Sequence, residues 1–221
     1  MNKFIIISKK VWDQKNYIKF NKKKFFFFKK INENKIFKIN PKIIFFIHWS
    51  KIIKPKIYKK YICIQFHSSN LPKFKGGSPI QNQIIRGVQK TKITSFRINS
   101  KIDGGDICLK KNISLKGRAE EIYKRIENIS LKMIIQITSM KKIKFFKQKG
   151  SSSNYKRRME KQSNIGYYKL KSLKKYYDFI RMLDASGYPN AFCIFGKYKF
   201  YFKNAKLKKK SVVGNFEIKK K

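Results

Sequence analysis

Two residue types suited to proton transfer follow predicted strands in the central part of the chain. His67 comes directly after the apolar run that begins at Tyr61, and Asp103 lies in the turn KIDGGD after the alternating run Thr91 to Ile98. Open α/β sheets bind ligands beyond the carboxyl ends of their strands, so both side chains can converge on one edge. A neutral imidazole beside a carboxylate provides a proton acceptor and a group that orients it.

Each of these features has a plainer interpretation when it is taken alone. A single histidine at a strand end is more often structural than catalytic, and Asp-Gly-Gly-Asp is most often a simple turn. Gly76 and Gly77 remove side chains where the flat ring of a ligand could approach the backbone. The order and spacing of the residues between His67 and Asp106 therefore distinguish the structural from the catalytic interpretation.

The elements that would position these residues are mostly short apolar strands. Continuous apolar runs separated by helical or loop segments favour a parallel sheet that is covered on both faces. The run Phe25–Phe28 fits either a strand or a connection. Strands are predicted at Lys3–Ser8, Lys42–Ile47, Tyr61–Phe66, Thr91–Ile98 and Ile107–Lys110.

The most regular helical pattern runs from Gly117 to Met140. A shorter helix is predicted to begin at Ser78-Pro79, with Ser78 as the N-cap and proline in the first turn, and to stop at Gly87. In the longer helix, apolar residues recur at three- and four-residue intervals on one face, namely Ile122, Ile126, Ile129, Met133, Ile137 and Met140.

Composition and turn signals divide the chain into three parts. The sheet is expected within residues 1–147, and the polar stretch 148–163 is predicted to be a linker. Residues 164–221 are predicted to form a small β-containing C-terminal module, with a helix at Leu170–Leu183 and strands at Ala191–Phe202, around Gly196-Lys197, and at Val212–Ile218. The fold class is therefore α/β with a mostly parallel sheet.

The composition is strongly basic, with 56 Lys and Arg residues against 11 Asp and Glu and a formal net charge of +45. Such a charge usually indicates nucleic acid or an anionic membrane as partner. The excess is almost all Lys, however, and Arg, which suits bidentate phosphate and base contacts, is scarce. Ile, Phe, Asn and Tyr are frequent as well and share AT-rich codons, so genome bias explains the charge while a nucleic-acid partner stays open.

Metal, disulfide and membrane signals are weak. Cys63, Cys108 and Cys193 are widely spaced without a CxxC pair, so neither a zinc site nor a disulfide framework is predicted. His48 has no acidic or cysteine neighbour, and no metal is expected. The N-terminal apolar run is too short for a signal-peptide core, and Ile43–Ile47 is too short to span a bilayer. We therefore expect a cytoplasmic protein without a membrane partner.

The stretch from His67 to Asp106 resembles the signature of the formyltransferase family that uses 10-formyltetrahydrofolate. That signature runs Asn-x-His, x-Ser-Leu-Leu-Pro, a basic/aromatic pair, Gly, a helix opening with Pro-Ile-Gln and, about one helix and one strand later, Leu-Asp-x-Gly-Asp. The resemblance implies a Rossmann-like formyltransferase domain. The residues that match it in order and spacing are His67, Ser69, Leu71-Pro72, Phe74-Lys75-Gly76, Pro79-Ile80-Gln81, Ile102-Asp103 and Gly105-Asp106.

The C-terminal part resembles two branches of this family, which formylate methionyl-tRNA or nucleotide-linked amino sugars. The resemblance covers roughly Lys42 to Ile218, and the shorter, glycine-poor region before it implies a trimmed folate-binding half. The matching C-terminal residues are Arg157-Arg158, Phe179-Ile180-Arg181, Tyr188-Pro189, Ala191-Phe192 and Phe202.

By this resemblance His67, Asp103 and Gln65 are the catalytic residues. An amine attacks the formyl carbon, and the oxyanion that forms is held by His67 with help from Gln65 or backbone N–H groups. Asp103 orients His67 or ordered water and helps to remove the ammonium proton. Gln65 stands where the family has Asn, so it keeps a carboxamide donor but adds a methylene.

The binding residues implied by the resemblance divide by ligand. We expect His67 and Asp103 to face each other across a pocket that admits a pterin. The folate co-substrate, 10-formyltetrahydrofolate, is assigned to Leu71, Gly76, Gly77 and Asp106, and the amine substrate to Ser69, Lys75 and Gln81.

Three functions remain open at this point. An amino group on a nucleotide-linked sugar is the preferred acceptor, because the chain is short and its C-terminal module compact. Methionyl-tRNA, in practice the initiator tRNA, is the alternative that the basic charge favours. The third is an inactive, formyltransferase-like basic binding protein, which Gln65 and the reduced N-terminal half support. The oligomeric state is not predicted.

Overall fold

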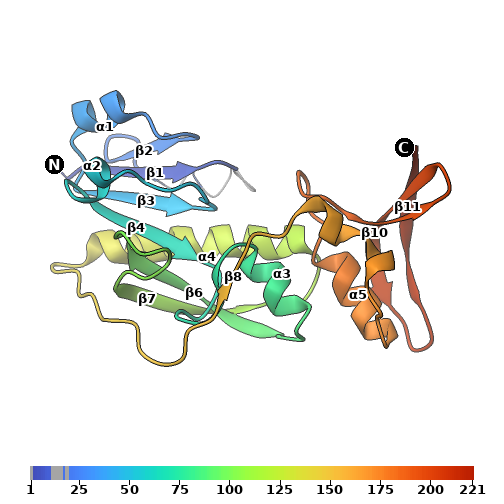
Figure 1. Ribbon diagram of the computed structural model, residues 1–221. Helices are drawn as coiled ribbons and strands as arrows, with labels where there is room; N and C mark the ends of the chain where they lie inside the picture. Colours follow the sequence, from blue (N-terminus) through green and yellow to red (C-terminus); the bar gives the residue numbers. More distant parts are fainter. Residues whose placement is uncertain (1, 11–16, 18–19) are drawn as a thin grey trace. The chain divides into compact units, whose positions relative to one another are not determined.

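The computed structural model, which describes residues 2–10, 17 and 20–221, contains a six-stranded sheet in the order β2-β1-β3-β4-β6-β7 (Figure 1). The first four strands are parallel, and β6 runs antiparallel to β4. The strands are β1 (Phe4–Ser8), β2 (Phe25–Phe28), β3 (Ile43–Ile47), β4 (Ile62–His67), β6 (Lys90–Arg97) and β7 (Ile107–Ser114). The predicted mostly parallel sheet is confirmed, and the run Phe25–Phe28 is a strand.

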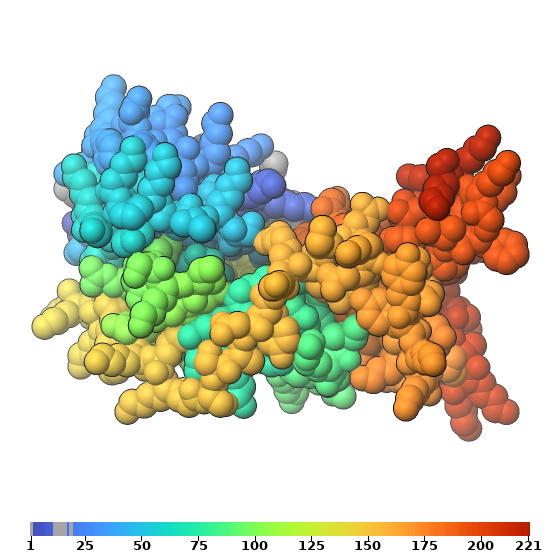
Figure 2. All heavy atoms as spheres, in the orientation of Figure 1, coloured from blue at the N-terminus to red at the C-terminus, as the bar shows by residue number. Residues whose placement is uncertain are grey.

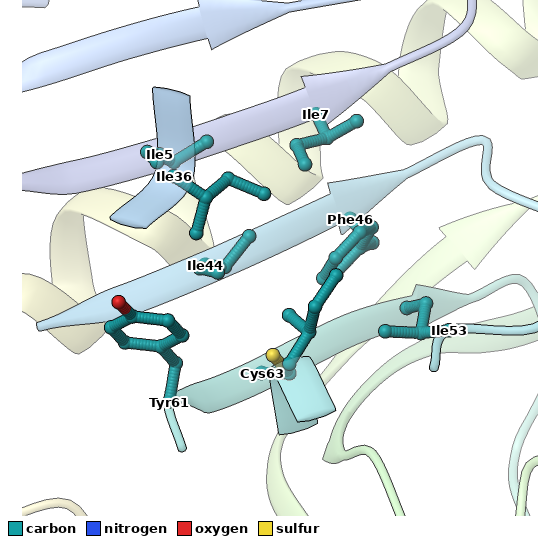
Figure 3. Close-up of a cluster of buried hydrophobic side chains, with 9 residues drawn as sticks. Ile5, Ile7, Ile36, Ile44, Phe46, Ile53, Tyr61 and Cys63 are labelled. Atoms are coloured by element: carbon teal, nitrogen blue, oxygen red, sulfur yellow. The ribbon is translucent and has the colours of Figure 1, made fainter. Parts of the chain in front are cut away.

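Every residue of β1 and β3 is buried, so both faces of these strands are covered. On one face, isoleucines of β1 and β3 meet Ile36 of α1 (Glu33–Ile39) and Ile57 of α2 (Pro55–Tyr58). Full burial of such a side chain contributes about 1.5–3 kcal/mol. Figure 3 shows most of this apolar cluster, whose buried members are Ile5, Ile7, Ile36, Ile44, Phe46, Ile53, Ile57, Tyr61 and Cys63.

Helix α4 (Ala119–Ser139) confirms the longest helical pattern in the sequence. Its apolar stripe is largely buried, with Ile122, Ile126, Met133 and Ile137 each at most 1% exposed. The spacing of these residues matches 3.6 residues per turn, which places them on one side of the helix. The helix therefore forms because one stripe of its surface is taken from water.

Helix α3 (Pro79–Ile84) begins where the sequence predicts, but Ser78 does not cap it. Ser78 has a left-handed backbone with φ 50°, and its side chain makes no capping hydrogen bond. The Oγ atom instead accepts a hydrogen bond from the backbone N–H of Arg158 at 3.1 Å. Ser78 therefore occupies the predicted N-cap position, but a long-range contact takes its hydroxyl, so the side chain does not cap the helix.

A three-stranded antiparallel sheet in the order β11-β10-β9 confirms the predicted C-terminal β module. The nearby helix α5 (Leu173–Arg181) is shorter than the predicted range. Arg181 is buried, and its guanidinium donates to the carbonyls of Leu115 at 2.6 Å and Gly117 at 2.8 Å. The strands are β9 (Ala191–Phe195), β10 (Tyr198–Leu207) and β11 (Val212–Lys220), and the segment before α5 holds the short turns η2 (Glu160–Ser163) and η3 (Ile165–Tyr167).

The chain forms two compact units. The first comprises Met1–Gly76, Thr91–Ile113 and Lys124–Asn154, and the second comprises Gly77–Lys90, Ser114–Tyr123 and Tyr155–Lys221. A two-stranded sheet pairs β5 (Lys75–Gly76) with β8 (Asn154–Tyr155), which lies inside the predicted linker. The predicted division after residues 147 and 163 stays a prediction.

Candidate active site

The imidazole of His67, at the end of β4, lies between two oxygen acceptors. Its Nε2 atom is 2.7 Å from the carbonyl oxygen of Phe74, and its Nδ1 atom is 3.5 Å from Oδ2 of Asp103. The His67 and Asp103 side chains are only 6% and 8% exposed. Because a carbonyl can only accept, Nε2 carries a hydrogen and donates it to Phe74. The other ring nitrogen is then the one that faces the carboxylate.

This geometry can accept a proton from a third group. In a neutral imidazole that is protonated at Nε2, Nδ1 holds a lone pair. That lone pair and the Asp103 carboxylate are both acceptors, and 3.5 Å is long for a direct hydrogen bond between them. A donor such as an amine or a water molecule placed beside both atoms would satisfy them together. The pair is therefore suited to taking up a proton.

The distance also corrects one expectation from the sequence. His67 and Asp103 were expected to face each other across a pocket wide enough for a pterin. At 3.5 Å between Nδ1 and Oδ2, no flat ring fits between the two side chains. A ligand would have to lie beside the pair rather than within it.

Both partners of His67 come from residues with left-handed backbone. Phe74 has φ 56° and Asp103 has φ 47°, a region that non-glycine residues rarely adopt. The Asp103 carboxylate is fixed further by the backbone N–H of Gly76, which donates to Oδ2 at 2.7 Å. Such backbone persists only where surrounding contacts determine it, and it is concentrated at functional sites.

Buried and partly buried hydrogen bonds hold the loop between His67 and β5. The hydroxyl of Thr94 donates to the carbonyl of Ser69 at 2.7 Å, and the hydroxyl of Ser69 donates to the carbonyl of Lys73 at 2.6 Å. Lys110 donates from Nζ to the carbonyl of Leu71 at 2.6 Å. Burial, helped by the charge of Lys92, lowers the pKa of Lys110. The loop that delivers the Phe74 carbonyl is thus tied down by side chains of β6 and β7.

The turn that carries Asp103 depends on glycine and on Gln148. A Cβ atom at Gly105 would lie 1.6 Å from the carbonyl oxygen of Arg97, so only glycine fits there. The amide nitrogen of Gln148 donates to the carbonyls of Asp103 and Gly105, both at 2.8 Å. These two hydrogen bonds match the two N–H groups of one carboxamide.

Gln65, the third predicted catalytic residue, lies two residues before His67 on β4. Its Nε2 atom donates to the carbonyl oxygen of Trp49 at 3.3 Å. A carboxamide has two N–H groups, and this hydrogen bond uses one of them. The hydrogen bond of the Gln65 side chain thus goes to Trp49 rather than to the His67–Asp103 pair, and the catalytic role of Gln65 stays a prediction.

The predicted binding residues in the first unit differ in their surroundings. Leu71 is fully buried, and Ser69 uses its hydroxyl within the loop. Lys75 and Gly76 form β5, where the Gly76 N–H reaches Asp103. Asp106 is exposed, and its carbonyl accepts from the N–H of Arg97 at 2.8 Å. Gly76 is thus the binding residue that the structure brings directly to the pair.

Gly77 and Gln81 belong to the second unit and have packing roles there. A Cβ atom on Gly77 would lie 2.3 Å from the Cα atom of Arg157. The amide nitrogen of Gln81 donates to the hydroxyl of Tyr123 and to the carbonyl of Met182, both at 3.0 Å. These contacts account for the two residues without a ligand, so their predicted binding roles stay predictions.

Three parts of the site have no signal in the sequence analysis. The Phe74 carbonyl is a main-chain group, which a sequence pattern does not mark. Gln148 and Ser153 lie in the stretch that was predicted to be a linker because of its polar composition. Their long-range hydrogen bonds join residues that are 45 and 79 positions apart, so local pattern analysis misses them.

The part of the chain that the structure describes has neither a cluster of metal-ligating side chains nor a helix that could cross a membrane. No group of three or more His, Cys, Asp or Glu side chains in this part is placed to hold a metal ion. Across the same residues, no helix combines the length and the apolar character needed to cross a bilayer.

The family model described as "Formyl transferase" matches residues 6–138, more than half of the chain. The chain belongs to this family. A second model, described as "Methionyl-tRNA formyltransferase, C-terminal domain", matches residues 160–219 of this formyltransferase-family chain. The predicted family and Rossmann-like fold are confirmed.

Individual relatives agree with the family models. The methionyl-tRNA formyltransferase of Rickettsia massiliae is 31% identical over 134 residues, which are 58% of this chain and 44% of the relative. That of Rickettsia felis is 31% identical over 141 residues, which are 61% and 46% of the two chains. The chain therefore spans about half the length of the curated relatives that it matches.

Solved structures match over greater lengths. The structure of methionyl-tRNA formyltransferase from Clostridium thermocellum is 38% identical, with a TM-score of 0.91 and full coverage of both chains. A sugar N-formyltransferase from a Shewanella species has a TM-score of 0.72 over 95% of this chain and all of its own, at 17% identity. The second match shows the shared fold alone.

Proposed function

We propose that this protein transfers a formyl group from 10-formyltetrahydrofolate to the amino group of methionyl-tRNA in the cytoplasm. The observation that carries this proposal is the buried His67–Asp103 pair at the carboxyl end of β4, in a chain of the formyl transferase family. The pair presents two acceptors to one point in space, which suits the removal of a proton from an amine that becomes acylated.

In this proposal the folate, when bound, supplies the formyl carbon as an electrophile. The side chains of the protein take up the proton of the amine and stabilise the negative charge that develops. The Nε2–H of His67 is held by the Phe74 carbonyl, so Nδ1 faces the reacting side together with Asp103. The two groups take the proton that the amine loses as its nitrogen bonds to the formyl carbon. They return this proton to the folate nitrogen when the bond between that nitrogen and the formyl carbon breaks. General acid–base catalysis of this kind contributes about 10²–10⁴ in rate.

Because the Nε2–H of His67 donates to the Phe74 carbonyl, the negative charge on the formyl oxygen, which the resemblance assigned first to His67, needs another donor. Gln65 has one N–H group beyond the one that donates to Trp49, and it stands where the family has Asn. We assign this second N–H to the developing charge. The loss of one such donor typically lowers the rate by about 10²–10³.

Folate binding is assigned to the loop surfaces beside the pair. Gly76 places backbone next to Asp103 without a side chain, so a flat ring can approach there. Asp106 is exposed and available for hydrogen bonding to such a ring, and Leu71 supports the loop from within the core. Ser69, Lys75, Gly77 and Gln81 remain predicted ligand-binding residues.

The comparisons favour methionyl-tRNA, which the sequence analysis gave as the alternative, over the preferred nucleotide-linked amino sugar. The relatives at 31–38% identity have methionyl-tRNA formyltransferase in their names, whereas the sugar N-formyltransferase from Shewanella is 17% identical. The net charge of +45 also suits an RNA substrate through long-range attraction.

A direct acceptor assay tests this proposal. The purified full chain is incubated with 10-formyltetrahydrofolate and either methionyl-tRNA or a nucleotide-linked amino sugar, and formylated product is measured. We expect turnover with methionyl-tRNA and a KM that rises steeply with salt, because several phosphate contacts release counterions. Turnover on the sugar with a shallow salt dependence would instead reverse the choice of acceptor.

The inactive binding-protein alternative is tested by thermal shift with a stable folate analogue. A folate analogue at 100 times its Kd stabilises a protein by about 2.7 kcal/mol. A measured shift supports the enzyme, while no shift at millimolar analogue together with no turnover would favour the binding protein.

A further inference from the structure

The segment Gln148–Ser153 contacts both loops that meet the imidazole of His67. We propose that this segment, here called the 148–153 strap, is a positioning element that fixes the two partners of His67 for catalysis. The inference rests on the proposed formyl transfer at this site. The strap lies in the stretch whose composition predicted a linker, so its role comes from the structure.

Gln148, at the N-terminal end of the strap, binds the turn that carries Asp103. Gln148 donates both amide hydrogens, one to the Asp103 carbonyl and one to the Gly105 carbonyl, each at 2.8 Å. Carbonyls only accept, so the hydrogen-bond network assigns the amide nitrogen to this position. The two bonds bracket Gly104 and fix the turn on which the Asp103 carboxylate is mounted.

Ser152 and Ser153, at the C-terminal end of the strap, bind the loop that carries Phe74. Ser153 Oγ accepts a hydrogen bond from the backbone N–H of Phe74 at 2.9 Å, and the Ser153 carbonyl accepts from the N–H of Lys75 at 2.8 Å. Ser152 Oγ donates to the carbonyl of Pro72 at 3.3 Å. These bonds surround Phe74, whose carbonyl accepts from His67.

Backbone strain explains why such fixation is needed. Asp103 and Phe74 both have left-handed φ values, of 47° and 56°. Backbone of this kind is unfavourable for a non-glycine residue and persists only when neighbouring contacts impose it. The strap supplies hydrogen bonds to both residues, at the Asp103 carbonyl and at the Phe74 N–H.

The strap lies at the surface, and none of its residues belongs to the buried apolar cluster. Lys149, Gly150, Ser151 and Ser152 are exposed, and Gln148 and Ser153 are half-buried. Figure 1 draws β8, which follows the strap, and Figure 2 shows the yellow-orange stretch around residue 150 at the molecular surface. Substitutions in the strap should therefore leave the apolar cluster intact.

The test compares Gln148→Met and Ser153→Ala with matched controls in the full-length protein. Gln136, which is exposed on α4, provides Gln136→Met as a control of the same chemistry, and Ser153→Thr restores the hydroxyl acceptor. Formyl transfer to methionyl-tRNA gives kcat and KM. The ¹⁵N chemical shifts of the His67 ring report its surroundings without activity, and the chain has only two histidines to assign.

We expect Gln148→Met to lower kcat by about 10²-fold with unchanged KM for methionyl-tRNA, since a displacement of about 1 Å at a reacting group has an effect of this size. Ser153→Ala should lower kcat less, Ser153→Thr should restore it, and Gln136→Met should leave it unchanged. The His67 ring shifts should change in Gln148→Met and Ser153→Ala only.

A normal kcat and unchanged His67 ring shifts in Gln148→Met would overturn the positioning role of the strap. An equal loss of kcat in Gln136→Met would overturn it as well. A wild-type protein that transfers no formyl group would instead remove the proposed function, and the ring shifts would then decide the positioning role by themselves.

Discussion

The apolar cluster around β1 and β3 and the loops around His67 belong to the same compact unit but are built in different ways. The cluster is held by burial, with Ile5, Ile7 and Ile44 fully enclosed. The loops are held by hydrogen bonds from side chains to main-chain atoms and contain left-handed residues such as Phe74. Stability and catalytic geometry therefore have separate sources in this protein, and substitutions in the two regions should affect them separately.

The largest effect on the loop side is expected from Asp103→Asn. The amide keeps the shape and can still accept from the Gly76 N–H, but it no longer takes up a proton beside His67. We expect kcat to fall by about 10²–10⁴, while the melting temperature stays close to that of the wild type. An active Asp103→Asn enzyme would show that the carboxylate is only structural.

The matching change on the core side is Ile44→Ala. Ile44 is fully buried on β3, and truncation to alanine leaves a cavity that costs about 2–5 kcal/mol. Urea unfolding should show this loss of stability, whereas kcat measured well below the melting temperature should stay near the wild-type value. A large fall in kcat without a loss of stability would break the separation of the two regions.

Gln65→Leu changes a residue that belongs to both regions. Gln65 lies on β4, a strand of the core sheet, and its side-chain amide donates to the Trp49 carbonyl. If its second N–H supports the developing charge, kcat falls by about 10²-fold. Gln65→Asn, which has the family's residue, should retain activity. Equal kcat values in Gln65→Leu and the wild type would assign this role to backbone N–H groups instead.

A smaller effect is expected at His48, which follows β3 and lies outside the proposed chemistry. Burial, with the nearby charge of Lys10, lowers the pKa of His48 to about 4. An unfolded histidine has a pKa of about 6.5, so between these values the unfolded chain binds more protons than the folded chain. Stability from this group is therefore present above pH 6.5 and is lost as the pH falls toward 4.

The measurement is urea unfolding at pH 7.5 and pH 5. The His48 shift contributes a loss of roughly 2 kcal/mol over this interval. His48→Asn should flatten the dependence, since asparagine does not titrate and accepts the left-handed backbone, φ 51°, at this position. The same slope in wild type and variant would show that His48 does not cause it.

The two regions also differ in how far the sequence predicts them. The buried strands follow from continuous apolar runs such as Lys42–Ile47, and α4 follows from its helical spacing, because burial leaves a local pattern. The His67–Asp103 pair was predicted from the strand ends and the family resemblance. The Phe74 carbonyl and Gln148 were not, because main-chain acceptors and contacts between residues 45 positions apart leave no local signal.

Ser78 is a case in which the sequence predicts the position of a residue but not its hydrogen-bond partner. Its position at the start of α3 was predicted, yet its hydroxyl binds Arg158, which is 80 residues away, rather than the helix. Local propensity places an element, while long-range hydrogen bonds decide what its polar side chains do.

The proposed function requires the imidazole of His67 as a proton acceptor in formyl transfer to methionyl-tRNA. Its most direct test measures formylated methionyl-tRNA formed by wild type and by His67→Ala at equal concentrations, with melting curves for both. We expect turnover by the wild type, none by His67→Ala, and melting temperatures that show both proteins folded. Near-normal formyl transfer by folded His67→Ala would contradict it.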